Sequence, residues 1–216
     1  LAIYAISDNG IVSDRSEVLV VSTLPDLSET PAALRKAIVQ ETSFQVIWSH
    51  SPRAITYNIY SNDELIHTVS APVNFVDFDD VEPGALHNIQ VAAVGIDGES
   101  PRSQILPVIT KISSPQNITI EQLDIVTNIT WDEIPHAVSY KIYYKTDISD
   151  INYSGTGLSL GENMLPVTSP ILVSDFISSV TGRHGVQLYN FMPDISYWFA
   201  ITAIGQDGHE SIMARY

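Results

Sequence analysis

Residues Trp48–Tyr60 read WSHSPRAITYNIY, and Trp131–Tyr143 read WDEIPHAVSYKIY. Both stretches begin with Trp and have Pro four, Ala six and Tyr nine residues later. A match of four residue types at fixed offsets indicates a domain that is repeated along the chain. This pattern identifies the fold much better than the function, and no other stretch points to a single activity.

A second pattern, of alternating apolar and polar residues around a glycine, occurs in residues 1–23, 90–110 and 199–216. In the first copy, the Asn9-Gly10 dipeptide favours the positive φ of a tight hairpin turn. Each copy is interpreted as the last two strands of a repeat. Aligning the glycines places Ala5 with Ala93 and Ala203, and Ser13 with Ser211.

Short segments of alternating polarity follow one another between turn-forming residues, which predicts an all-β sandwich. In Ser43–Ser49, for example, Phe44, Val46 and Trp48 alternate onto one face. No stretch longer than ten residues has a helical period. We therefore expect tandem immunoglobulin-like β-sandwiches. The predicted divisions are a C-terminal strand pair of a truncated module in 1–24, one module in 26–110 and a second module in 112–216.

In combination, these residues resemble the fibronectin type III domain. The residues that carry the resemblance are Pro31, Trp48, Tyr57, Val81, Pro83, Gly84, Ala93, Gly98 and Ser100 in the first repeat, and Pro115, Trp131, Tyr140, Phe191, Pro193, Tyr197, Ala203, Gly208 and Ser211 in the second. His87 departs from the pattern, since it stands where the family has a corner tyrosine. The repeats are similar in style to fibronectin type III modules of bacterial surface and secreted proteins, which implies an extracellular or cell-surface location.

The second repeat carries an insertion near 146–185. Tyr140 and Tyr197 are 57 positions apart, whereas Tyr57 and His87 are 30 apart, so 27 residues are extra. The first part, residues 149–163, is rich in Gly, Ser and Asn and is interpreted as loop. The second part, 164–180, is apolar. Two interpretations stay open: a hairpin that covers its own sheet and turns at Gly182–Gly185, or a loop that recognises a protein partner.

The chain is acidic and has no cysteine. Its net charge of −15 is spread as −2 over residues 1–25, −7 over 26–110 and −6 over 111–216. A dispersed negative surface argues against binding to nucleic acid. Without cysteine there are no disulfides, thiolate nucleophiles or cysteine-ligated zinc sites. No run of about 20 apolar residues predicts a membrane span.

No residue pattern predicts catalysis, and no catalytic, cofactor-binding or metal site is assigned. The histidines have no metal-ligand spacing and are expected on the surface or in turns: His50, His67, His87, His136, His184 and His209. The acidic cluster Asp77, Asp79 and Asp80 is interpreted as a solvated sheet edge, with calcium binding as the alternative. Sequons begin at Asn117, Asn128 and Asn152. Trp198 is expected to pack across the sheet or to stack on sugar rings.

The sequence thus predicts non-catalytic structural, spacer or assembly modules. The alternative is an accessory glycan-binding or protein-binding module of a larger secreted enzyme or adhesin. The expected partners are another protein, a glycan, or neighbouring copies joined by strand addition at the chain ends. Residues 1–23 belong either to a longer array or to a strand pair that completes the sandwich of the next copy. The second arrangement would build a filament.

Overall fold

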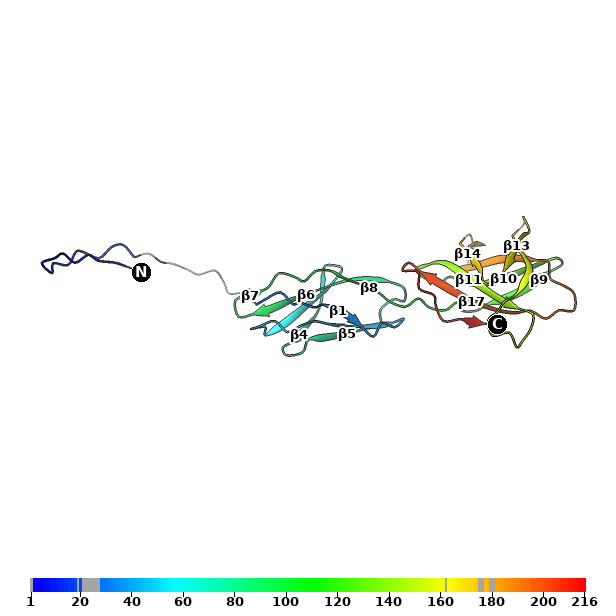
Figure 1. Ribbon diagram of the computed structural model, residues 1–216, viewed down its shortest axis with the longest axis horizontal. Coiled ribbons are helices and arrows are strands. Elements are labelled where there is room, and N and C mark those ends of the chain that lie inside the picture. Colours follow the sequence, from blue (N-terminus) through cyan, green and yellow to red (C-terminus); the bar gives the residue numbers. More distant parts are fainter. Residues whose placement is uncertain (1, 19, 21–27, 162, 175–176, 179–181) are drawn as a thin grey trace.

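The structure, a computed structural model, describes residues 2–18, 20, 28–161, 163–174, 177–178 and 182–216. The described residues form strands, turns and loops and contain no helix (Figure 1). The expected all-β class is therefore correct. Strands β1–β8 lie between residues 35 and 109, and strands β9–β18 lie between 119 and 215. Each set encloses its own hydrophobic core.

The first sandwich packs a three-stranded sheet on a five-stranded sheet. The three-stranded sheet has the order β1 (Arg35–Ala37), β2 (Ser43–Ile47), β5 (Phe75–Asp79). The five-stranded sheet has the order β4 (Glu64–Ser70), β3 (Thr56–Ser61), β6 (Leu86–Gly95), and both β7 (Gly98–Glu99) and β8 (Leu106–Ile109) pair with β6. All pairings are antiparallel.

The second sandwich has the same plan with a larger first sheet. That sheet runs β13 (Leu165–Thr168), β12 (Thr156–Leu160), β16 (Arg183–Tyr189), β10 (Val126–Asp132), β9 (Thr119–Leu123), and β15 (Ile177–Ser178) also pairs with β16. The other sheet runs β14 (Ile171–Val173), β11 (Ala137–Lys145), β17 (Trp198–Gly205), β18 (Ala214–Arg215).

The repeated Trp-to-Tyr stretch forms the same core feature in both sandwiches. Trp48 and Trp131 are 2% and 0% exposed, so both indoles lie in the cores, as the alternation of Phe44, Val46 and Trp48 onto one face implies for the first. Each indole packs edge-on against the tyrosine nine residues later, with ring centroids 5.3 Å and 4.9 Å apart. In the first sandwich, the buried Tyr57 hydroxyl accepts a hydrogen bond from the Ser51 N–H at 2.9 Å. The loop before the next strand is thereby fixed to the core.

The alternating pattern around the glycines also recurs as one structural feature. In the first sandwich, the Ser100 N–H donates to the Ala93 carbonyl, and the Ala93 N–H donates to Ser100 Oγ. The same pair of bonds joins Ser211 with Ala203, and Ser13 with Ala5. The described part of the N-terminal segment therefore has the hydrogen-bond register of the last two strands of a sandwich.

The insertion differs from the expected arrangement. Thr156–Leu160, within the stretch interpreted as loop, is strand β12, and Leu158 is 1% exposed in the core. Gly155 of this stretch has a packing reason, since the Tyr144 ring and carbonyl leave no room for a Cβ there. The hairpin turns between β12 and β13, where Met164 N–H donates to the Gly161 carbonyl, and not at Gly182–Gly185. Residues 183–189 are instead the central strand β16.

Candidate assembly site

The last strand of the second sandwich pairs with only part of its neighbour. In the first sandwich, β8 pairs with Leu86–Ile89 of β6, with Leu106 opposite Ile89 and Val108 opposite His87. In the second, β18 pairs with Ala200 and Ile201, and the Tyr216 N–H donates to the Phe199 carbonyl at 3.0 Å. Tyr197, which corresponds to His87, has no strand beside it among the described residues.

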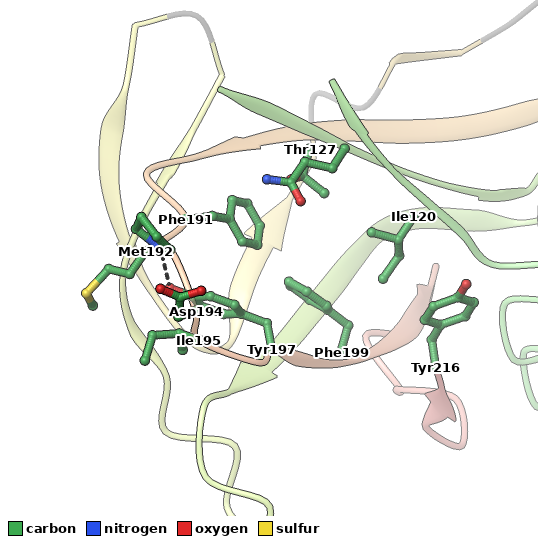
Figure 2. Close-up of a pocket in the computed structure, with 11 residues that line it drawn as sticks. Ile120, Thr127, Phe191, Met192, Asp194, Ile195, Tyr197, Phe199 and Tyr216 are labelled. Carbon is green, nitrogen blue, oxygen red and sulfur yellow. Dashed lines mark hydrogen bonds between the residues drawn. The ribbon is translucent and has the colours of Figure 1, made fainter. Parts of the chain in front are cut away.

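A cavity of about 440 Å³ lies between the corner before β17 and Tyr216. Figure 2 shows Phe191, Tyr197, Phe199 and Ile120 around it, with Tyr216 at one side. The remaining lining residues are Gln122, Thr127, Met192, Pro193, Asp194 and Ile195. In the first sandwich, the corresponding space is filled by Val108, which is 0% exposed.

The corner that precedes β17 holds one wall of this cavity in place. Tyr197 Oη accepts a hydrogen bond from the Met192 N–H at 3.1 Å, and its ring lies 4.8 Å from that of Phe191. In the first sandwich, His87 packs on Phe44 with centroids 5.1 Å apart, but its buried Nε2 has no hydrogen-bond partner within the described residues. His87 therefore lacks the hydrogen bond to the backbone that Tyr197 makes at the corresponding corner.

A second candidate surface is the junction between the sandwiches. The Lys111 N–H donates to the Gln40 carbonyl, and the Lys111 carbonyl accepts from the Gly84 N–H. The next linker residue, Ile112, is 4% exposed and belongs to the core of the second sandwich. One residue of the linker is therefore bonded to the first sandwich, and the following one is buried in the second.

Side chains cross the junction on two sides. Ser113 Oγ donates to Glu41 Oε2 at 3.1 Å. His136 Nε2 lies 3.4 Å from Glu82 Oε2, close enough for an ion pair, although the geometry is not that of a hydrogen bond. A Cβ on Gly84 would meet the His136 Cβ at 3.0 Å, so glycine lets the two modules approach at this corner. The two sandwiches lie end to end in Figure 1.

The N-terminal segment exposes its apolar side chains. The large ones are Ile3, Tyr4, Ile6, Ile11, Val12, Val18 and Val20, each at least 55% exposed. The hydrogen bonds of described residues 2–18 stay within the segment, for example from Ser16 N–H to the Ile3 carbonyl. An apolar strand pair without a covering sheet is at best marginally stable in water.

The residues singled out in the sequence lie in different environments. Trp198 is half-buried, so its ring neither packs fully in the core nor stands free. Asp77 accepts a hydrogen bond from Gln45 Nε2 at 2.8 Å across the sheet edge. No group of His, Asp and Glu side chains that could hold a metal ion occurs in the described part of the chain. His184 corrects the expectation of surface histidines, because it is 6% exposed and bonds Tyr140 Oη at 2.9 Å.

A polar cluster on the outer face of the second sandwich was not predicted. Glu210 accepts hydrogen bonds from Tyr143 Oη, Thr202 Oγ1 and Lys141 Nζ, each at 2.6 Å. Burial alone would raise the pKa of Glu210, but these three donors outweigh it and hold the pKa below its ordinary value. Burial and the carboxylate raise the pKa of Tyr143 to about 12. The first sandwich has the matching pair, Tyr60 Oη donating to Glu99 at 2.6 Å.

Comparison with solved structures identifies the architecture. A two fibronectin type III domain segment from chicken tenascin matches with a TM-score of 0.57 and 16% identity, covering 87% of this chain and 98% of its own. The fold is that of tandem fibronectin type III domains. The fn3 domain of human contactin 1 has a TM-score of 0.36 and 21% identity over 44% of this chain and 89% of its own. The FN1-FN3 domains of chicken CNTN1 have 0.34 and 15% over 100% and 76%. The assignment rests on the tenascin pair.

No model of a known protein family matches the chain. The described residues include no helix long and apolar enough to cross a membrane.

Proposed function

We propose that this chain is a non-catalytic spacer and assembly segment of a secreted or cell-surface protein, with modules of the kind found in bacterial surface proteins. The fibronectin type III fold, the end-to-end order of the sandwiches and the dispersed acidic charge support this role. A spacer needs a defined length, and an assembly segment needs surfaces that join it to neighbours.

The observation that carries the proposal is the junction. Lys111 and Ile112 are adjacent, yet the first is bonded to one sandwich and the second is buried in the other. A linker tied on both sides leaves little freedom for bending, whereas Gly/Ser linkers behave as flexible coils. The polar contacts Ser113–Glu41 and His136–Glu82 join the two sandwiches beside the linker and favour one relative orientation of them.

Solution scattering tests the spacer role. Residues 28–216 of the wild-type chain should have the maximum dimension of two aligned sandwiches. A variant with six Gly/Ser residues inserted between Ser113 and Ser114 should give a broad distribution of distances between the two sandwiches. A six-residue insertion between Asn62 and Asp63, at a hairpin turn of the first sandwich, is the matched control and should leave the distribution of inter-sandwich distances narrow. If the wild-type chain bends as freely as the linker variant, the spacer role is wrong. Turnover of any substrate by the purified chain would contradict the non-catalytic assignment.

A second candidate function, recognition of a protein partner through the insertion, has one observation in its favour. Lys145 is 8% exposed, and its Nζ donates to the carbonyls of Ile148 and Asp150 at 2.9 Å and 2.8 Å. The loop is therefore pre-organised, and it presents Ile148 and Ile151 at 70% and 87% exposure. Pre-organisation lowers the entropy cost of binding.

The paired substitutions Ile148→Ser and Ile151→Ser test that candidate. They should weaken binding of a protein partner at least tenfold, because the two side chains are the apolar contacts that the loop offers. Ile96→Ser, at a residue 90% exposed in the first sandwich, should leave binding unchanged. If the wild-type chain, the double variant and Ile96→Ser bind the partner equally, the insertion is not the recognition surface.

A further inference from the structure

The two sandwiches differ in how the edge of one strand is paired. In the first, β5 pairs with β2 on one side and with no strand of the described residues on the other. In the second, the corresponding strand β16 pairs with β10 on one side and with both β12 and β15 on the other. The edge strands β1 and β4 correspond to β9 and β14, which are edge strands too. The insertion therefore covers, in the second sandwich, the counterpart of the unpaired edge of β5.

The backbone of β5 directs hydrogen-bonding groups toward this unpaired side. The Trp48 N–H donates to the Asn74 carbonyl at 3.0 Å, which fixes the positions that face β2. Because the groups of an antiparallel strand alternate in direction, Val76 and Phe78 also face β2, and the intervening residues face away from it. The residues that present their N–H and carbonyl groups at the unpaired edge are Phe75, Asp77 and Asp79.

The insertion engages the corresponding residues of β16. Aligning the two strands at Val76 and Val186 gives Gly185, Gln187 and Tyr189 as these residues. Gly185 pairs with β15, and Tyr189 pairs with β12. Between them, the Gln187 carbonyl accepts a hydrogen bond from the Gly161 N–H at 3.1 Å. The second sandwich thus shows that a strand can be added at this place in the fold.

The side chains of β5 define which strand would fit its edge. Phe75 is 44% exposed, and Asp77 and Asp79 are exposed beside it on the outer face. Neither carboxylate forms an ion pair with another residue in the described part of the chain. Val76 and Phe78 are buried on the inner face. An added strand would therefore meet two carboxylates on its outer side and the margin of the core on its inner side.

The charge of this edge distinguishes a second copy from a different partner. Two copies joined through β5 would bring aspartates close together, and like charges directly opposite each other destabilise a pair of strands. A strand with Lys or Arg at alternate positions would instead place cations opposite Asp77 and Asp79, where opposite charges stabilise the pair. The edge thus disfavours its own copy and favours a basic strand.

We propose that the edge of β5 binds an extended basic segment of a protein partner by strand addition. Alternate Lys or Arg side chains would lie opposite Asp77 and Asp79, and the apolar side chains between them would lie over the margin of the core beside Phe78. The segment would take the place that β12 and β15 have in the second sandwich. This interaction goes beyond the spacer role, since the contacts described at the junction do not involve β5.

A nuclear magnetic resonance titration of the full-length chain with a synthetic peptide tests the site. The probe is Thr-Lys-Leu-Lys-Val-Tyr-Thr, whose two Lys residues oppose Asp79 and Asp77 when it runs antiparallel to β5. Binding should shift the amide signals of β5 and leave those of β16 unchanged, because β16 is already paired on both sides. The absence of shifts in β5, or equal shifts in both strands, would overturn the proposal.

Two N-methylated forms of this peptide separate strand addition from attraction by charge alone. Methylation of the backbone nitrogens of both Lys residues removes the N–H groups that would face β5, so it should weaken binding at least about tenfold. Methylation of the Leu and Val nitrogens, whose N–H groups face away from β5, is the matched control and should change the dissociation constant by at most about twofold. Equal losses for the two forms would refute pairing between backbones.

Two pairs of substitutions test the selection by charge. Asp77→Asn together with Asp79→Asn should weaken peptide binding at least about tenfold at low ionic strength. Asp97→Asn together with Asp124→Asn removes the same charge at exposed residues elsewhere and should stay within about twofold of the wild-type chain. Equal effects of the two pairs would show general attraction by an acidic protein and contradict the proposal.

Self-association of the wild-type chain decides between the two kinds of occupant. If sedimentation shows a dimer and the peptide does not dissociate it, while the amides of β5 lie in the dimer interface, the occupant is a second copy and the basic partner is wrong. A wild-type chain that binds the peptide as a monomer supports the proposal. None of these outcomes alters the scattering test of the spacer role, so the two proposals can fail separately.

Discussion

His87 and Tyr197 occupy corresponding positions in the two sandwiches, but their side chains differ in hydrogen bonding. Tyr197 accepts a hydrogen bond from the backbone of Met192, whereas the buried Nε2 of His87 has no partner in the described part of the chain. We expect His87→Tyr to stabilise the first sandwich by about 1 kcal/mol, the net value of one hydrogen bond. Chemical denaturation followed at the first sandwich measures this, and Tyr197→His should lower the stability of the second by a similar amount.

His87 also gives the first sandwich a dependence on pH. Desolvation by burial lowers its pKa from the ordinary value of 6.5, so the unfolded chain takes up a proton more readily than the folded one. Stability is complete above pH 6.5 and falls as the pH drops through the lowered pKa. His87→Tyr should remove this part of the acid sensitivity. If the variant loses as much stability at low pH as the wild-type chain, the imidazole of His87 has the same pKa in the folded and the unfolded chain.

The Tyr143–Glu210 pair predicts that the second sandwich loses stability at high pH as well as at low pH. Because the pKa of Tyr143 is raised to about 12, its contribution to stability is complete below pH 10 and is lost as the pH rises through about 12. Glu210 has a lowered pKa, so its contribution is present above pH 4.5 and is lost as the pH falls. The free energy of unfolding, measured across pH, should fall less steeply at alkaline pH for Tyr143→Phe than for the wild-type chain. Identical declines for variant and wild type would contradict the assignment.

These residue-level features differ in how far the sequence predicts them. Burial of Trp48 and Trp131 follows from alternation along a strand, which is a local pattern. The bond between Tyr140 and His184 joins residues 44 positions apart, and the Tyr143–Glu210 bond joins residues 67 apart. Such pairs depend on sheet register, which one sequence without its fold does not specify.

At the scale of elements, β12 shows why the insertion was misinterpreted. Its sequence, TGLSL, is rich in residues that favour turns, and Leu158 is its only side chain in the core cluster of fully buried residues. Strand β12 forms because it pairs with both β13 and β16, and the Tyr144 ring packs where Gly155 has no Cβ. Tertiary packing thus outweighs local propensity. The strand after the insertion still keeps its place, since Val186 lies opposite Ile129 as Val76 lies opposite Val46 in the first sandwich.

A pair of substitutions in this hairpin tests whether it is part of the core. Leu158→Ala should cost about 2–5 kcal/mol of the second sandwich's stability, as expected for a leucine that is 1% exposed. Leu165→Ala, across the same hairpin at 60% exposure, should change stability by at most about 0.5 kcal/mol. Thermal unfolding measures both. A small loss for Leu158→Ala would mean that the hairpin is a decoration and not a structural layer.

At the scale of the whole molecule, the two sandwiches are aligned by contacts that contribute little to folding. Glu82 and His136 have side chains 59% and 32% exposed, and ion pairs of this kind contribute about 0–1 kcal/mol. The two cores are separate clusters, and Ile112 belongs to the second alone. Orientation and stability are therefore distinct properties of the junction, and each sandwich should fold on its own contacts.

Trp131→Ala tests that independence. Removing this fully buried indole should cost about 3–5 kcal/mol, out of a domain stability of roughly 5–15 kcal/mol. The second sandwich should come close to unfolding, while amide exchange in residues 35–109 stays as slow as in the wild-type chain. Trp48→Ala is the reciprocal control, and it should leave residues 119–215 protected. If either variant makes both sandwiches melt in one shared transition, the junction transmits folding energy as well as orientation, because separate cores alone would give two transitions.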